Sequence, residues 1–225
     1  MKQNSETKTL GLIHTSATLV PVFQELTDKY LADKNIKIFN ISDDSLIKNT
    51  IERGILTPDT SRRVVNHVAS AEEAGADFIM VTCSSIGPAV ETAATLVNVP
   101  VLRVDQPMAD KAVRMASKIG VVATLSTTLE PTSDLVRRRA IFAGKKIELT
   151  SKLCEGAFDA LMSGNPEHHD ESVASALKEL SQQVDVILLA QASMARVVNQ
   201  LSDADRKVPI LTSPELAVQH LADLI

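Results

Sequence analysis

Short apolar runs alternate along the chain with longer segments in which apolar residues recur every three or four positions. In the first half, the runs predict strands at residues 9–15, 36–41, 77–82 and 101–104. The segments between them have helical spacing and predict helices at residues 19–32, 58–74, 88–96 and 107–117. Pro58 at the start of one helix and Gly75 just after its end are typical of helix boundaries. Strands that are apolar throughout, each followed by a helix, predict an α/β fold with parallel sheets covered on both faces.

The second half of the chain repeats this pattern. It predicts strands at residues 118–123, 146–153, 185–190 and 209–211, and helices at 130–143, 155–162, 170–182, 193–201 and 214–224. Three pairs of residues in equivalent runs follow in the same order: Gly11 with Gly120, Asp77 with Asp185, and Pro100 with Pro209. The offset is 109 residues for the first and last pairs (120 − 11 and 209 − 100) and 108 for the second (185 − 77).

This repeat predicts two pseudo-symmetric units, each a parallel sheet flanked by helices. We expect the first unit to comprise residues 1–105 together with 212–225, because the last helix is expected to pack back onto it. The second unit is then residues 106–211. Generic α/β periodicity accounts for part of the similarity between the halves, but three ordered anchors favour a true duplication.

Composition and charge exclude several classes of function. The chain has 225 residues, of which 44% are hydrophobic and 23% charged, as in ordinary globular proteins. No apolar run approaches the roughly 20 residues of a membrane span, and the polar N-terminal residues lack the apolar core of a signal peptide. Two distant cysteines then indicate reduced thiols and a cytoplasmic protein. A net charge of −5 without a basic cluster, with no Trp and a single Tyr, argues against nucleic acid as a partner.

Candidate binding residues lie where the predicted strands end, because ligands collect beyond the carboxyl ends of parallel strands. In the first unit these residues are His14, Thr15 and Ser16, then Cys83, Ser84 and Ser85. In the second unit they are Thr124, Ser126 and Thr127, then Gln191, Ala192 and Ser193. Hydroxyl groups and free backbone N–H groups at such turns suit a carboxylate or another small anion. The alternative is that each Ser or Thr only caps a helix, but four turns converging near one thiol favour a site.

Cys83 is the candidate with the most specific chemistry. It follows a strand and precedes a helix, and a helix N-terminus can lower a thiol pKa, whereas the alternative is a small core residue. Cys154 also follows a predicted strand, and we interpret it as a core residue. The cluster at residues 167–171 contains His168, His169 and Asp170. We interpret it as a solvated helix start capped by Asp170, not as a metal site.

Three segments carry a resemblance to a known family: residues 75–85, which end Thr82-Cys83-Ser84-Ser85; residues 99–105; and residues 185–194. On them, and over nearly the whole chain, the sequence resembles the aspartate/glutamate racemase superfamily. This superfamily also includes hydantoin and allantoin racemases, maleate isomerases and arylmalonate decarboxylase. The resemblance implies two pseudo-symmetric α/β domains with the active site in the cleft between them, no cofactor or metal, and a homodimer as one expected state. It also implies that one cysteine from each half flanks the α-carbon of a small carboxylate substrate, one removing a proton and the other delivering one to the opposite face.

This chain departs from that pattern. The second cysteine of the family falls at Gln191, or at Ala190 if the alignment slips by one residue, and neither side chain exchanges a proton at neutral pH. Three functions stay open. In the first, the chain is a racemase or isomerase in which Cys83 is one base and another group, such as Cys154 or His14, is the second. Alternatively, it is a lyase or one-base isomerase that uses Cys83 alone, or a non-catalytic protein that binds small acids. Arg53, Arg103 and Arg196 are candidates to meet a second carboxylate on the substrate.

Overall fold

The chain divides into two compact units in the computed structural model, which describes residues 7–202 and 205–225. The first unit comprises Met1–Val104 and Pro214–Ile225, and the second comprises Asp105–Ser213. Each contains one four-stranded parallel sheet, so the predicted α/β fold with two parallel sheets is confirmed.

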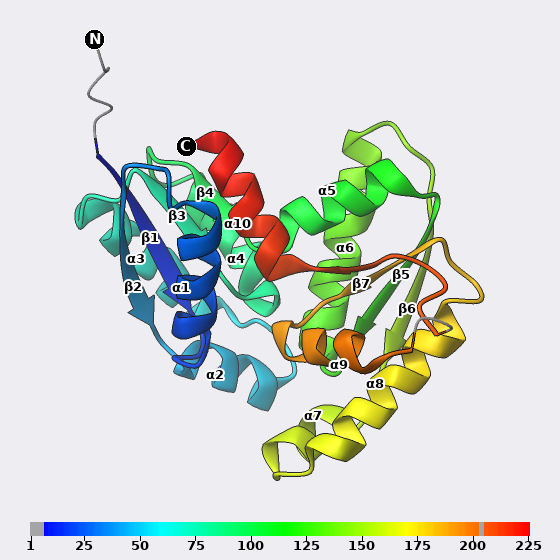
Figure 1. Ribbon diagram of the computed structural model, residues 1–225. Helices are drawn as coiled ribbons and strands as arrows, with labels where there is room; N and C mark the ends of the chain where they lie inside the picture. The colour runs from blue at the N-terminus through cyan, green and yellow to red at the C-terminus, as the bar shows by residue number, and fades with distance from the viewer. Residues whose placement is uncertain (1–6, 203–204) are drawn as a thin grey trace. The chain divides into compact units, whose positions relative to one another are not determined.

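The sheet of the first unit has the strand order β2-β1-β3-β4 (Figure 1). Its strands are β1 (Lys8–His14), β2 (Ile36–Ser42), β3 (Phe78–Val81) and β4 (Val101–Arg103). The central strand β1 pairs with β2 on one side and β3 on the other, and Ile13 lies opposite both Ile41 and Val81. The carboxyl ends of β1 and β3 are therefore neighbours.

Helices cover both faces of this sheet. They are α1 (Leu19–Tyr30), α2 (Ser45–Arg53), α3 (Pro58–Glu73), α4 (Gly87–Ala94) and α10 (Ser213–Leu224), with a short 3₁₀ helix η1 (Ser84–Ile86) before α4. On one face, Leu12 and Met80 pack with Phe23 of α1 and with α10. On the other, Ile79 and Val81 pack with helices α2, α3 and α4. Alternate residues of β3 thus enter different cores, as the period of a strand requires.

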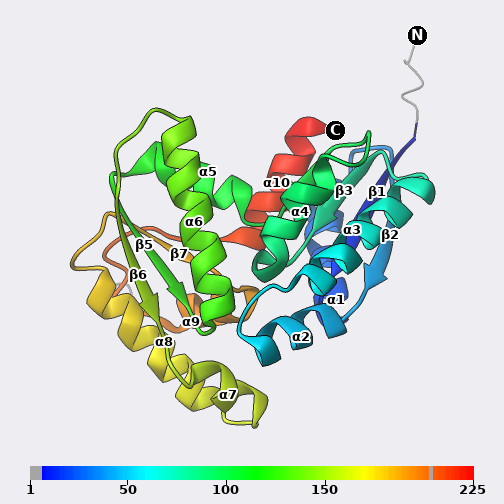
Figure 2. The same ribbon diagram turned by 180° about the vertical axis from the view of Figure 1, so that it is seen from behind.

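The sheet of the second unit has the equivalent order, β6-β5-β7-β8 (Figure 2). Its strands are β5 (Lys118–Ala123), β6 (Glu148–Leu153), β7 (Val186–Leu189) and β8 (Ile210–Thr212). Its helices are α5 (Gln106–Met115), α6 (Ser126–Phe142), α7 (Ala157–Met162), α8 (Pro166–Leu180) and α9 (Ala195–Gln200), with the 3₁₀ helix η2 (Ala192–Met194) before α9. The register is equivalent too, because Gly120 lies opposite Ile187 as Gly11 lies opposite Ile79.

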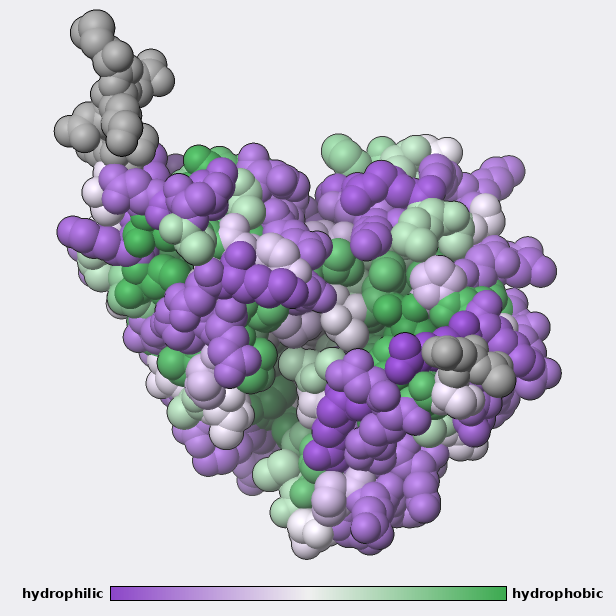
Figure 3. Space-filling model, in the orientation of Figure 1, coloured by the Kyte–Doolittle hydropathy of each residue, from purple (hydrophilic) through white to green (hydrophobic). Residues whose placement is uncertain are grey.

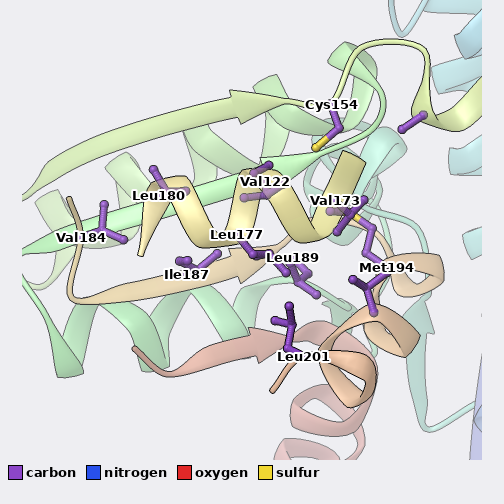
Figure 4. Packing of buried hydrophobic residues seen from close by; sticks show 13 residues of the cluster. Val122, Cys154, Val173, Leu177, Leu180, Val184, Ile187, Leu189, Met194 and Leu201 are labelled. Carbon is purple, nitrogen blue, oxygen red and sulfur yellow. The ribbon is translucent and has the colours of Figure 1, made fainter. Parts of the chain in front are cut away.

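Helix α8 supplies much of the core of the second unit (Figure 4). Its residues Leu177 and Leu180 pack against Val122 of β5 and Ile187 of β7. Burial of one leucine side chain stabilises the fold by about 1.5–3 kcal/mol. The face of α8 that carries Leu177 and Leu180 is therefore the one turned toward the sheet. Gly120 makes the close approach possible, because a Cβ at this position would lie 2.5 Å from Cδ2 of Leu180.

Three local predictions from the sequence are wrong. Helix α2 lies in a segment for which no helix was predicted, because only one edge of it is apolar and buried, at Leu46. Helix α6 begins at Ser126 and not at residue 130, so Pro131 lies inside it. Helix α8 begins at Pro166 with Asn165 as its cap, so Asp170 does not cap it.

Hydrophilic residues cover most of the face drawn in Figure 3. Among the described residues, no helix combines the length and the hydrophobicity that crossing a membrane requires.

Candidate active site

Cys83 lies directly after β3 and Thr82, and it is the first residue before η1. Part of the residue is exposed. Burial of the sulfur raises the pKa of the Cys83 thiol, and hydrogen bonds from the Thr15 hydroxyl and from the backbone N–H groups of Ser85 and Ile86 act in the opposite direction. Donors from the ends of two adjacent strands therefore converge on one sulfur. They favour the thiolate form, although the thiol is the form present at neutral pH.

His14 ends β1 and is fully buried. Its Nδ1 lies 2.9 Å from Oγ1 of Thr82, and its Nε2 lies 2.9 Å from Oδ1 of Asn40 on β2. Burial lowers the pKa of His14, and the hydrogen bond to Asn40 acts in the opposite direction. Both ring nitrogens are engaged inside the protein.

A charged cluster that was not predicted from the sequence lies beside His14. The backbone N–H of Asp43, the first residue after β2, donates to the carbonyl of His14. The carboxylate of Asp43 accepts from Ser45, from Arg63 at 2.5 Å and from His67 at 2.8 Å. Burial acts to raise the pKa of Asp43, but these partners outweigh it and lower the pKa to about 2. Two of the residues come from α3, so sequence spacing gave no sign of this cluster.

The other candidates of the first unit are the serines beside these residues. Ser84 and Ser85 are buried in η1, and Ser16 is half-buried with its hydroxyl 2.7 Å from that of Thr18. The caps of α1 and η1 make no side-chain capping hydrogen bond. Helix capping therefore does not explain these serines.

In the second unit, Gln191 occupies the place that Cys83 has in the first: it follows β7 and precedes η2. Its Oε1 accepts from the backbone N–H of Thr124 at 2.6 Å and from the Thr124 hydroxyl at 3.0 Å. Because an N–H group needs an acceptor, the amide oxygen must face Thr124, and the NH₂ group of Gln191 points elsewhere. No described residue accepts a hydrogen bond from that NH₂ group.

The remaining candidates of the second unit lie at the starts of α6 and η2. Ser126 is the exposed first residue of α6, and Ser193 and Ala192 lie in η2. Neither helix start has a side-chain cap. The hydroxyl of Thr127 is buried and has no hydrogen-bond partner within the described part of the chain. The first turn of α6 therefore offers free donors to a ligand.

Cys154 follows β6, in the second unit. Burial raises its pKa to about 11, although the charge of Lys152 acts to lower it. Its sulfur lies 3.8 Å from the carbonyl of Ser172. A shallow groove of about 360 Å³ reaches Cys154 between β6 and α8. A thiol with this pKa is a poor base at neutral pH, which agrees with its interpretation as a core residue.

The arginines considered for a second substrate carboxylate have protein partners or lie at the surface. Arg103 is buried and pairs with Glu91 of α4. Arg196 pairs with Asp170, and Arg53 is exposed in the last turn of α2. Across residues 7–202 and 205–225, no group of three or more His, Cys, Asp or Glu side chains is placed to hold a metal ion.

Several solved structures share this architecture. A glutamate racemase from Bacillus anthracis superimposes with a TM-score of 0.75 at 16% sequence identity, over 96% of this chain and 81% of that one. An aspartate racemase from Picrophilus torridus gives 0.71 at 15% identity, over 96% and 94% of the two chains. An allantoin racemase from Klebsiella pneumoniae gives 0.63 at 17% identity, over 96% and 87%. At these identities the likeness shows a shared fold.

A comparison with proteins of curated function found no significant match. The sequence model of the family described as Asp/Glu/Hydantoin racemase, in contrast, matches residues 10–221. This match covers nearly all of both units. The chain therefore belongs to the Asp/Glu/Hydantoin racemase family.

Proposed function

We propose that this protein is a cofactor-independent racemase or isomerase of an amino acid or a related small carboxylic acid, in which Cys83 transfers a proton at the α-carbon. Membership in the family supports the reaction class. The observation that carries the assignment is the set of donors around Cys83: the Thr15 hydroxyl and the N–H groups of Ser85 and Ile86 all favour its thiolate. The proposal extends to a cytoplasmic protein that forms a homodimer.

The chemical step requires a base and stabilisation of an anion. The Cys83 thiolate takes the proton from the α-carbon, and the electron pair left behind delocalises onto the carboxylate oxygens as an enediolate. Donors around those oxygens lower the barrier, because the added charge develops there. The resemblance to the family implies that both units contribute such donors, and within the second unit the unpartnered Thr127 hydroxyl and the uncapped start of α6 are donors of this kind. The proton then returns to the carbon from the Cys83 thiol or from a group on the opposite face.

Residue 191 determines which of these two groups can return the proton to the carbon. In the two-cysteine mechanism that the family resemblance implies, residue 191 serves the face opposite Cys83. An amide cannot exchange a proton at neutral pH, but its free NH₂ group donates two hydrogen bonds. We therefore assign Gln191 to binding the carboxylate and Cys83 to proton transfer. A one-cysteine lyase is the second candidate, because such an enzyme needs no proton-transferring group at residue 191.

The test is exchange of substrate α-hydrogen in D₂O, followed by NMR and chiral chromatography over acidic and neutral amino acids, hydantoins and malonates. We expect Cys83→Ser to lower the exchange rate on the order of 10²- to 10⁴-fold, the usual contribution of a positioned acid–base group. Cys154→Ser is the matched control and is expected to leave the rate within about twofold, because burial raises the pKa of that thiol to about 11 and, unlike at Cys83, no hydrogen-bond donor acts to lower it.

The products separate the remaining functions. Exchange with inversion supports a racemase, whereas exchange without inversion supports a one-base enzyme, and loss of CO₂ from a malonate supports the lyase. Saturable binding of a carboxylate that survives Cys83→Ser, without turnover of any compound, would contradict both enzyme assignments.

A further inference from the structure

The polar contacts of His14 connect three strand ends in the first unit. His14 is the last residue of β1, Asn40 lies in β2, and Thr82 immediately follows β3. Both contacts to the imidazole are 2.9 Å long, and the ring is fully buried beside the ring of Phe23, with 5.6 Å between centroids. His14 thus joins strands that are far apart in the sequence.

The contacts of this group and its burial together favour one arrangement of its protons. The Thr82 hydroxyl has one proton and two acceptors within reach, Nδ1 of His14 at 2.9 Å and the carbonyl of Ile13 at 3.2 Å. A neutral imidazole with its proton on Nε2 donates to Asn40 and accepts from Thr82 at Nδ1, so every polar atom has a partner. Burial, which lowers the pKa of His14, favours this neutral form. The carboxylate of Asp43, whose backbone N–H donates to the carbonyl of His14, is engaged by Ser45, Arg63 and His67.

The neighbours of His14 and Thr82 in sequence are the residues that define the surroundings of the thiol. Thr15, which follows His14, gives its hydroxyl to the sulfur of Cys83. Thr82 immediately precedes Cys83. At the equivalent positions of the second unit, whose proton-transfer residue is replaced by Gln191, stand Ala123 and Ala190, both buried and unable to form such a contact.

We propose that His14 is a positioning residue and not the second base: its neutral imidazole ties Thr82 to β1 and β2 and so holds Thr15 and the Cys83 loop in register. This inference rests on the proposed role of Cys83. A base must present a free lone pair to the substrate, and His14 has neither a free nitrogen nor exposed surface. It also lies at the same edge of the same sheet as Cys83.

Two substitutions of His14 each keep one of its two hydrogen-bond contacts and remove the other. In His14→Asn the amide can still reach Thr82, where Nδ1 was, and in His14→Gln it can reach Asn40, where Nε2 was. We expect His14→Gln to raise the pKa of the Cys83 thiol, measured as the pH dependence of its alkylation by iodoacetamide. A rise of about one pKa unit lowers the thiolate fraction about tenfold at fixed pH. We expect His14→Asn to retain most of the wild-type alkylation rate and α-hydrogen exchange, and Thr82→Val to behave like His14→Gln.

The opposite pattern would overturn the inference. If His14 were a base, both amide variants would lose α-hydrogen exchange equally while the alkylation profile of Cys83 stayed unchanged. Nitrogen-15 NMR of the wild-type imidazole gives a test that does not depend on folding of the variants: we expect the neutral Nε2–H tautomer at pH 7, and a protonated ring or the Nδ1–H tautomer at pH 7 would contradict it. Because alkylation and NMR need no substrate, these results stay interpretable even if no turnover is found.

Discussion

The two units share one frame and differ in the chemistry placed on it. In the first unit, a threonine at the end of the central strand donates its hydroxyl to the sulfur of Cys83. In the second, the equivalent Thr124 donates to Oε1 of Gln191. Strand order, register and the 3₁₀ turn that follows are equivalent. The backbone therefore specifies where a side chain is presented, and the side chain alone specifies whether a proton can move.

The difference extends to the residues behind these positions. The backbone N–H groups of Asp43 and Cys154 donate to the last carbonyl of the central strand in their respective units, to His14 and to Ala123. Asp43 is an anion surrounded by donors, whereas Cys154 is a thiol whose pKa burial raises to about 11. The strand ends of the first unit thus carry a charged network, whereas Ala123, Ala190 and the protonated Cys154 stand behind Gln191 in the second.

The substitution Gln191→Cys would remove this difference most directly. We expect it to place a thiol beside the Thr124 hydroxyl and to raise the ratio of inversion to exchange on the order of 10²-fold, the lower range for an added acid–base group. Chiral chromatography of the products of the D₂O reaction measures the ratio. Gln191→Ser is the control, because it removes the amide without adding a thiol. An unchanged ratio in Gln191→Cys would count against the equivalence of residues 83 and 191.

Asp43→Asn tests the charged network of the first unit. The pKa of Asp43 is lowered to about 2 in the folded protein, below its ordinary value of 3.8. The carboxylate therefore stabilises the fold at pH values above its unfolded pKa, and this contribution is lost as pH falls toward 2. We expect about 2 kcal/mol of the free energy of unfolding to disappear in this window in the wild type and not in Asp43→Asn. Urea denaturation between pH 6 and pH 2.5 measures it, and parallel curves for the two proteins would show that Asp43 makes no such contribution.

Substitution of the equivalent glycines tests the packing of the two sheets, with a smaller expected effect. In Gly120→Ala the new Cβ would lie 2.5 Å from the buried Leu180, and we expect a loss of about 1–2 kcal/mol from overpacking. In Gly11→Ala the nearest atom would be Cζ of Phe39 at 3.0 Å, at the end of a half-buried side chain that can move. We expect a loss of under about 1 kcal/mol there. Urea denaturation at pH 7 measures both, and a larger loss in Gly11→Ala would contradict the assigned packing.

The sequence by itself determined the fold class, the parallel sheets and the equivalence of residues 83 and 191. Strand and helix periods are local, and a duplication repeats them at a fixed distance, so both can be seen without coordinates. Local signals failed where a helix is short and buries a single apolar side chain, as α2 does with Leu46, or where a proline is tolerated inside a helix, as at Pro131.

Only the tertiary structure decided which candidate residues are free to act. The sequence placed His14 among the substrate-binding candidates and as a second base. The structure buries it between Asn40 and Thr82 instead. It also gathers Asp43, Arg63 and His67 into one cluster from a strand end and a helix. These contacts join residues on neighbouring strands and helices that are distant along the chain. Burial and hydrogen bonding are therefore settled by strand order and register, which no local pattern in the sequence contains.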